Sequence, residues 1–175
     1  MSKGEPIPFD DALRIAKKHM IGLACLDTTE KIAIVGSLRR NTQEMVGDID
    51  YQVVCSGVRG MNKIEEYFWA KDWVCESAGD RRGIFKAPSG VYVNVFNTES
   101  MSWGAALMHN TGPSKYNIRK RAMIKRMDMV LNQYGLYKRI YDDDNPDDYE
   151  LIASETEKEI YDALSWEYCK PEDRE

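Results

Sequence analysis

Two aspartates, Asp48 and Asp50, stand near the start of GDIDYQVV, which spans residues 47–54. The run that follows them has the character of a half-buried strand. Successive side chains of a strand point to opposite faces, so the two carboxylates share one face, about 7 Å apart along the chain. Like charges held this close repel each other unless a cation lies between them. The stretch therefore predicts a site for a positively charged group.

A second motif, GSLRR at residues 36–40, ends the apolar strand that we predict at 31–37. Gly36 allows a close backbone approach, Ser37 offers a hydroxyl and an amide, and Arg40 adds a cation. A Gly-Ser turn beside paired carboxylates suits a nucleoside triphosphate together with Mg²⁺, which prefers carboxylate and phosphate oxygens. Two such ions would relieve the repulsion between the aspartates. The reaction so implied is attack of a hydroxyl on the α-phosphate, with pyrophosphate leaving.

These two motifs, joined in GSLRRNTQEMVGDID (36–50), resemble the palm signature of the X-family DNA polymerases, those similar to DNA polymerase beta, with one extra residue in the loop. WGAALMHNTGPSKYNIRKRAMIKR (103–126) is similar to that family's passage from palm to thumb. LNQYGLY (131–137) and SETEKEIYDALSWEYCKPEDRE (154–175) resemble its thumb. The lyase and helix-hairpin-helix modules of larger members have no counterpart. The chain thus resembles a minimal palm-plus-thumb member, as known from some viruses and phages.

The resemblance implies an α+β (mixed α/β) fold. A nucleotidyltransferase palm with a mixed or antiparallel sheet and flanking helices is expected at 1–105, and a small helical plus β-hairpin thumb at 106–175. The implied activity is that of a template-directed DNA polymerase of the gap-filling repair type, a transferase acting on a primer 3′-hydroxyl. Its partners would be primer–template or gapped DNA and a deoxynucleoside triphosphate. Its cofactor would be two ions of Mg²⁺, or of Mn²⁺.

The resemblance also assigns roles to single residues. The catalytic and metal-binding positions are Asp48, Asp50 and Asn94. The nucleotide-binding positions are Gly36, Ser37, Arg40, Gly47, Tyr116 and Asn117. The DNA-binding positions are Lys120, Arg121, Lys125, Arg126 and Tyr134. Within the DNA-binding set, Arg121 is expected at the minor groove of the template strand. Tyr116 has an alternative role, which is to pack within its helix.

An amide occupies the position where this family uses a third aspartate. Counting back from Thr111-Gly112, that position is Asn94, in VYVNVF (91–96). Asparagine brings no negative charge and cannot accept the proton of the primer hydroxyl. Three explanations stay open: a deliberate exchange that traps substrates, a naturally weakened or inactive member, or a misplaced alignment in which Glu99 or another acid serves.

Six cations and no acid lie between Lys115 and Arg126, although the formal net charge of the chain is −5. Acids gather in YDDDNPDD (141–148) and in the carboxy-terminal helix. This split predicts a local positive face that can neutralise duplex phosphates, more weakly at high salt. A plain solvated helix face is the alternative. Near this helix, His109 could contact the sugar or triphosphate, or cap the end of its own helix.

Periodicity and turn residues predict the remaining elements. Helices are expected at about 9–25, 61–72, 102–112 and 114–129, with a last helix begun by Ser154-x-x-Glu157; strands are expected at 31–37, 48–55, 73–79, 83–88, 90–97, 134–139 and 149–154.

Composition points to a globular protein of a reducing, cytosol-like compartment. The four cysteines are widely spaced and form no C-x-x-C pair, which disfavours a zinc site or a disulfide framework. No apolar stretch approaches the roughly 20 residues that span a bilayer. We therefore expect a cytoplasmic monomer, in the host cytoplasm if the protein is viral, with no membrane partner. Two other functions stay open: a nucleotidyltransferase acting on another acceptor, and an inactive DNA- or nucleotide-binding relative.

Overall fold

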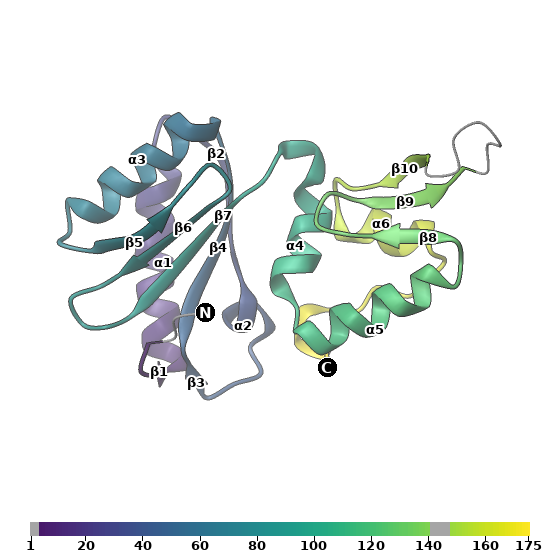
Figure 1. Cartoon of the computed structure of the whole chain (residues 1–175). Coiled ribbons are helices and arrows are strands. Elements are labelled where there is room, and N and C mark those ends of the chain that lie inside the picture. The colour runs from purple at the N-terminus through teal and green to yellow at the C-terminus, as the bar shows by residue number, and fades with distance from the viewer. Residues whose placement is uncertain (1–3, 141–147) are drawn as a thin grey trace. The chain divides into compact units, whose positions relative to one another are not determined.

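The computed structural model describes residues 4–140 and 148–175 (Figure 1). Contacts within the chain divide it into two compact units, Met1–Glu99 (unit 1) and Ser100–Glu175 (unit 2). The assignment of palm and thumb to residues 1–105 and 106–175 stays a prediction here, because compactness alone does not reveal what a unit does. Most of the acidic stretch at 141–148 lies outside the described residues.

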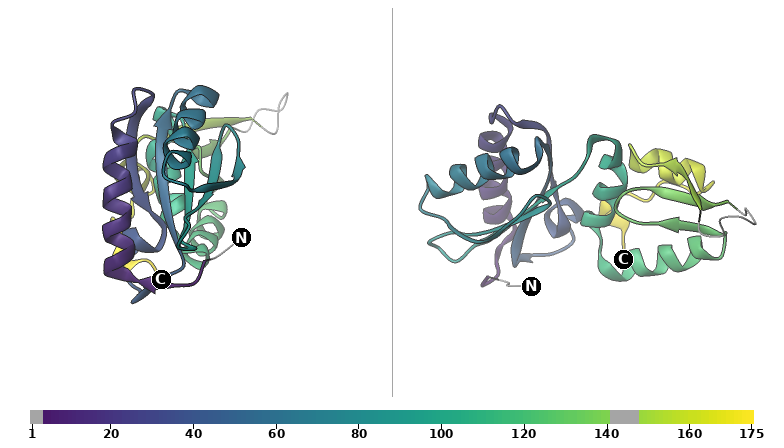
Figure 2. Two further views of the ribbon diagram at one scale, coloured as in Figure 1. Left: turned by 90° about the vertical axis from the view of Figure 1, so that its left-hand side faces the viewer. Right: turned by 45° about the horizontal axis from the view of Figure 1, so that its top comes forward.

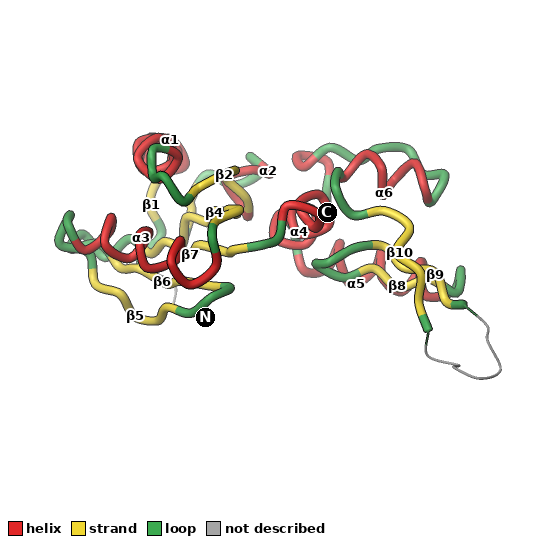
Figure 3. The backbone as a smooth tube through the Cα atoms, turned by 90° about the horizontal axis from the view of Figure 1, so that it is seen from above, coloured by secondary structure: helices red, strands yellow, loops and turns green. Residues whose placement is uncertain are grey.

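Unit 1 is a mixed sheet with helices α1 (Phe9–Ala24) and α3 (Gly57–Trp69) on one of its faces (Figure 2; Figure 3). The strand order is β2-β4-β7-β6-β5. The strands are β2 (Thr29–Val35), β4 (Asp48–Cys55), β5 (Val74–Ala78), β6 (Arg82–Lys86) and β7 (Tyr92–Asn97). The pair β4–β7 is parallel and the other neighbours are antiparallel. The predicted mixed α/β fold is thus confirmed.

The core of unit 1 fills the space between this sheet and the two helices. Ile49 and Tyr51 of β4, and Val93 and Val95 of β7, are buried without solvent exposure. The hydroxyl of Tyr51 donates to the backbone oxygen of Ala16 at 2.7 Å, which ties the sheet to α1. Each fully buried apolar side chain of this size contributes about 1.5–3 kcal/mol. Because side chains alternate along a strand, the residues between these core positions face the side of the sheet that α1 and α3 do not cover.

Two short elements complete unit 1. Helix α2 (Gly36–Arg40) starts where β2 ends, so the strand predicted at 31–37 stops at Val35. The cause is Gly36, whose φ of +64° turns the backbone out of the extended conformation. Strands β1 (Ile7–Pro8) and β3 (Met45–Val46) form a separate antiparallel pair.

In its described residues, unit 2 combines three α-helices with an antiparallel sheet in the order β10-β9-β8. The helices are α4 (Trp103–Thr111), α5 (Ser114–Lys125) and α6 (Glu157–Ala163), and the strands are β8 (Met129–Leu131), β9 (Leu136–Arg139) and β10 (Tyr149–Ala153). One-turn 3₁₀ helices lie at Ser100–Ser102 and Pro171–Asp173. Figure 2 shows α5 alongside the sheet, and α5 packs against β8 while α6 packs against β10.

Two predictions for unit 2 were wrong in detail. The helix predicted to reach residue 129 ends at Lys125, because the chain turns through Asp128 (φ 54°) into the unexpected strand β8. The last helix is capped by Thr156 instead of Ser154: the Thr156 hydroxyl accepts from the backbone nitrogen of Glu159 at 3.1 Å. The sequence carries the capping-box spacing twice, two residues apart, and the structure uses the second.

A buried ion pair ties the carboxy-terminal segment to α6. Nη1 of Arg174, whose side chain is 0% exposed, lies 2.8 Å from Oε1 of Glu157. Nε and Nη2 of Arg174 both donate to the backbone oxygen of Cys169, and the hydroxyl of Tyr168 donates to Oε2 of Glu157 at 3.0 Å. The charges therefore have partners of opposite sign or matching hydrogen-bond character, which buried charges require.

Candidate active site

Asp48 and Asp50 lie at the start of β4, on the face of the sheet that α1 and α3 leave uncovered. Between and beyond them, Ile49 and Tyr51 point into the core. The parallel register of β4 and β7 sets Asp50 beside Asn94. The structure thus brings together the three residues that were assigned to one site, although Asn94 lies 44 residues beyond Asp50 in the chain.

The side chain of Asn94 is 4% exposed and makes hydrogen bonds in two directions. Its nitrogen, Nδ2, donates to Oδ1 of Asp50 at 2.8 Å and to Oδ2 of Asp48 at 3.3 Å. Its oxygen, Oδ1, accepts from Nη2 of Arg82 at 2.9 Å. Glu99, the alternative acid, is exposed and lies past the end of β7.

The two aspartates carry more negative charge than their surroundings neutralise. Burial, and then the charge of Asp48, raise the pKa of Asp50 from 3.8 to about 6. The hydrogen bond from Asn94 and the positive charges of Arg82 and Arg40 act in the opposite direction without cancelling this effect. A carboxylate with a raised pKa on an ordered strand is the state that a bound cation would relieve.

The predicted phosphate-binding turn lies directly against these carboxylates. A Cβ atom at Gly36 would lie 2.1 Å from Oδ2 of Asp50, so that only glycine fits here, in addition to its positive φ. Ser37 and Arg40 belong to α2, which packs against β4, and both are partly exposed. Gly47 immediately precedes β4. The turn, the aspartates and Asn94 therefore form one cluster in unit 1, which we call the acidic site.

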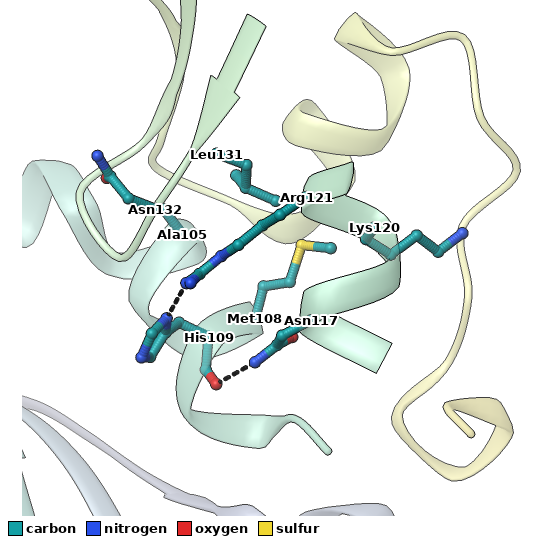
Figure 4. Close-up of a pocket in the computed structure, with 8 residues that line it drawn as sticks. All are labelled: Ala105, Met108, His109, Asn117, Lys120, Arg121, Leu131 and Asn132. Atoms are coloured by element: carbon teal, nitrogen blue, oxygen red, sulfur yellow. Dashed lines mark hydrogen bonds between the residues drawn. The ribbon is translucent and has the colours of Figure 1, made fainter. Parts of the chain in front are cut away.

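In unit 2, helix α5 carries the predicted DNA-binding cations. Lys125 and Arg126, at its carboxyl end, are exposed. Lys120 is partly buried, with its ammonium 4.5 Å from the centroid of the Trp166 ring. Figure 4 shows Arg121 reaching toward α4, away from Lys120.

The partner of Arg121 on α4 is His109, which the sequence analysis had not linked to it. Nη2 of Arg121 lies 2.6 Å from Nδ1 of His109, and Nδ2 of Asn117 donates to the backbone oxygen of His109 at 2.8 Å (Figure 4). Since a guanidinium only donates, Nδ1 of His109 accepts and its ring is neutral. Burial, and then the charge of Arg121, lower the pKa of His109 accordingly.

Comparison with known proteins finds similar sequences over most of the chain. The DNA polymerase beta thumb family matches residues 106–175. Over 154 residues the chain is 29% identical to "Repair DNA polymerase X" of African swine fever virus, Warthog/Namibia isolate. The match covers 83% of this chain and 82% of the viral protein. The Pretoriuskop tick isolate gives the same identity and coverage, and the Malawi tick isolate gives 27% over 151 residues.

The chain is homologous over most of its length to X-family DNA polymerases.

Members of the X family use divalent cations, and the acidic site offers a donor set for one such ion. Asp48 and Asp50 present carboxylate oxygens on one face of the sheet, which suits Mg²⁺ or Mn²⁺. The third position differs, since the atom of Asn94 that faces the aspartates is a nitrogen without a lone pair to donate. In the described part of the chain, no cluster of three or more His, Cys, Asp or Glu side chains is suited to hold a metal.

Two X-family roles expected in unit 2 need revision or stay predictions. Tyr116 is 2% exposed and its hydroxyl bonds to that of Tyr161, so it is a core residue of unit 2 and not an available nucleotide contact. Its burial depends on a segment some 45 residues further along the chain. Tyr134 is 40% exposed, and its backbone oxygen accepts from the Ser102 hydroxyl; its DNA-binding role stays a prediction.

Sequence reasoning missed Arg82, which the structure places beside Asn94, and it named His109 without linking it to Arg121. A signal for Arg82 exists: it begins a strand that pairs with the strand of Asn94. Using that signal requires the register of an antiparallel pair, which the sequence does not specify here. For His109, the sequence signal was only its position near the end of a helix. Among the described helices, none is long and apolar enough to cross a membrane.

Proposed function

We propose that this chain is a template-directed DNA polymerase of the gap-filling repair type, which extends a primer 3′-hydroxyl with deoxynucleoside triphosphates. The observation that carries the proposal is the acidic site, where two half-buried like charges lie against a Gly-Ser turn. The homology of the chain to proteins named "Repair DNA polymerase X" supports the choice of DNA as substrate. Unit 1 corresponds to the palm in this proposal, and the thumb family match at 106–175 supports a thumb in unit 2.

Each residue of the acidic site has a distinct task in this proposal. Asp48 and Asp50 hold a divalent ion, Mg²⁺ or Mn²⁺, together with oxygens of the triphosphate; the ion supplies positive charge to the transferring and leaving phosphates. The Ser37 hydroxyl and the Arg40 guanidinium bind the phosphates from the side of the turn. Gly36 leaves room for this contact because it has no Cβ.

Asn94 limits the rate of the chemistry. Its amide has no group that can accept the proton of the primer hydroxyl, and it adds no negative charge to the site. The chain as it stands therefore binds nucleotide and DNA and extends a primer slowly.

The cations of α5 bind the DNA backbone. Lys120, Arg121, Lys125 and Arg126 neutralise phosphates of the duplex, a contribution that weakens as salt rises. Arg121 leaves His109 when it reaches the template strand, and Asn117, which lies next to the same histidine, contacts the nucleotide. We expect no contact with either ligand from the buried Tyr116.

The decisive experiment is extension of a one-nucleotide gap by the chain and by Asn94→Asp, with each deoxynucleotide offered separately. Restoring the carboxylate should raise the extension rate by about 10²-fold or more, the usual contribution of a positioned base. Only the complementary nucleotide should be added. Glu99→Gln is the matched control and should leave the rate unchanged.

Two outcomes would contradict the proposal. If Asn94→Asp had no effect and Glu99→Gln abolished activity, the assignment of the acidic site would be wrong. If every nucleotide were added equally well, with or without a template, the chain would be a nucleotidyltransferase that acts on another acceptor.

A further inference from the structure

Arg82 determines which atom of Asn94 faces the aspartates. It is the first residue of β6 and lies opposite Phe96 in the antiparallel pair with β7, from where its side chain reaches back to Asn94. Nη2 of Arg82 donates to Oδ1 of Asn94, and this leaves Nδ2 to face the two carboxylates. The reverse orientation would set an amide oxygen against two carboxylates and an amide NH₂ against a guanidinium. Both contacts would be repulsive, so the chemistry of the neighbours allows one orientation of the amide.

The guanidinium has little freedom to give up this contact. Nε of Arg82 is buried and has no hydrogen-bond partner within the described residues. Within the described residues the bond from Nη2 to Asn94 is the hydrogen bond that this guanidinium makes, so its loss would leave the side chain with a second donor that has no partner. The guanidinium carbon also lies 5.2 Å from the centroid of the Phe96 ring, which further limits its position.

The amide nitrogen does for the aspartates part of what a cation would do. It brings partial positive charge to both carboxylates, and the Arg82–Asn94 contact brings a full positive charge within two hydrogen bonds of them. It cannot itself be a metal ligand, because Nδ2 has donors and no available lone pair. An ion seated between residue 94 and the aspartates would have to displace these hydrogen bonds.

We propose that Arg82 is a positioning residue that locks Asn94 as a donor, so that Arg82 and Asn94 take the place of one divalent cation and the site loads a single ion. That ion is the one that Asp48 and Asp50 share with the nucleotide phosphates. The presence of this shared ion rests on the proposed function. The loss of the second ion rests on the geometry of Arg82 and Asn94.

The test counts bound ions directly. The full chain is titrated with Mn²⁺ in the presence of a non-hydrolysable deoxynucleotide analogue. The electron paramagnetic resonance signal of the free ion reports how much Mn²⁺ is bound. The unaltered chain should bind one ion. Arg82→Met removes the donor and keeps the aliphatic length, so Asn94 can turn its oxygen inward; a second ion should then bind about 10- to 100-fold more tightly than to the unaltered chain.

Two further variants separate position from charge. Arg81→Met removes the same charge one residue away and should still bind one ion. Arg82→Lys restores a donor and should bring the count back toward one, which also keeps the test decisive if Arg82→Met proves unstable. Circular dichroism and the melting temperature verify that each variant is folded.

Three results would overturn the inference, and they differ from one another. Two ions bound to the unaltered chain would show that the Arg82–Asn94 contact does not replace a cation. A single ion in Arg82→Met, with the variant folded, would show that Arg82 does not control residue 94. Absence of Mn²⁺ binding to the unaltered chain with nucleotide present would overturn the proposed function as well.

Discussion

The two units of the chain each contain a cluster of buried or half-buried charges, and the clusters are opposite in design. In unit 2, Glu157 and Arg174 carry opposite charges, and each has further hydrogen-bond partners from the chain itself. In unit 1, Asp48 and Asp50 carry like charges on one strand face, and the pKa of Asp50 is raised to about 6. The first cluster is complete without a ligand and the second is not.

This difference separates structure from function. A buried pair of opposite charges is costly to break and close to neutral to replace as a whole, which is how a structural pair behaves. A pair of like charges lowers the stability of the fold that holds it, and such strain is typical of sites that bind a cation or perform chemistry. Removing a charge should therefore have opposite consequences in the two units.

The largest effect should come from the acidic site. In the Asn94→Asp background, where extension is fast enough to measure over a wide range, Asp50→Asn should reduce gap filling by about 10³-fold or more. The reason is that the remaining ligands no longer hold the ion that stabilises charge on the transferring phosphate by several kcal/mol. Single-turnover extension of a one-nucleotide gap measures this loss. Asp11→Asn removes the same charge from an exposed position in the first turn of α1 and should leave the rate of gap filling unchanged.

The structural pair should give the next largest effect, and on stability instead of activity. Arg174→Met leaves Glu157 buried and unpaired, so the free energy of unfolding of unit 2 should fall by about 3–5 kcal/mol. Urea unfolding followed by tryptophan fluorescence measures this loss in a variant whose unit 1 tryptophans, Trp69 and Trp73, are replaced with phenylalanine, so that the signal comes from unit 2. The double variant Glu157→Gln/Arg174→Met keeps an acceptor for Tyr168 and removes both charges, so it should recover most of the loss. A double variant as unstable as the single one would mean that lost packing, and not the unpaired charge, causes the effect.

The same contrast explains how much of each cluster could be predicted from the sequence. Asp48 and Asp50 were found because a strand has a period of two, so residues two apart share a face whatever the rest of the chain does. Asn94 was placed by the resemblance to a family, and the parallel register of β4 and β7 agrees with that placement. Arg82 could not be found, since its contact with Asn94 depends on where β6 pairs along β7.

The helices of unit 2 show the limit of local reasoning more clearly. Tyr116 has the position expected of a nucleotide contact in the family, but Tyr161, from α6, covers it. The capping residue of α6 was missed by two positions because Ser154 and Thr156 carry the same spacing to a glutamate. In both cases the local pattern is compatible with two structures, and packing between distant segments chooses one.

A third prediction uses pH to measure the repulsion in the acidic site. The pKa of Asp50 is raised to about 6 in the folded chain from its ordinary value of 3.8, so the folded state takes up this proton first as pH falls. Without metal, Asp50→Asn should be more stable than the unaltered chain at pH 7, by about 1–3 kcal/mol. This gap should narrow as pH falls through 6 and close near 4. Thermal unfolding in the presence of a chelator measures it; a gap that is constant with pH would mean that Asp50 is not strained by charge.

The exposed cations of α5 form a third class, and they should have the smallest effects. Lys125 and Arg126 are exposed at the end of their helix, so replacing both with alanine should leave stability within about 0.5 kcal/mol of the unaltered chain. If they contact DNA phosphates, the slope of log affinity against log salt should fall by about 1 for each cation removed. Fluorescence anisotropy with gapped DNA at several salt concentrations measures that slope.

The control is Lys17→Ala/Lys18→Ala, which removes the same charge from exposed positions of α1 in unit 1. An equal change of slope in both double variants would indicate that net charge, and not a surface on α5, governs DNA binding. A change confined to α5 would place the DNA contact on unit 2, where the charges are exposed, and leave the strained charges of unit 1 to the chemistry.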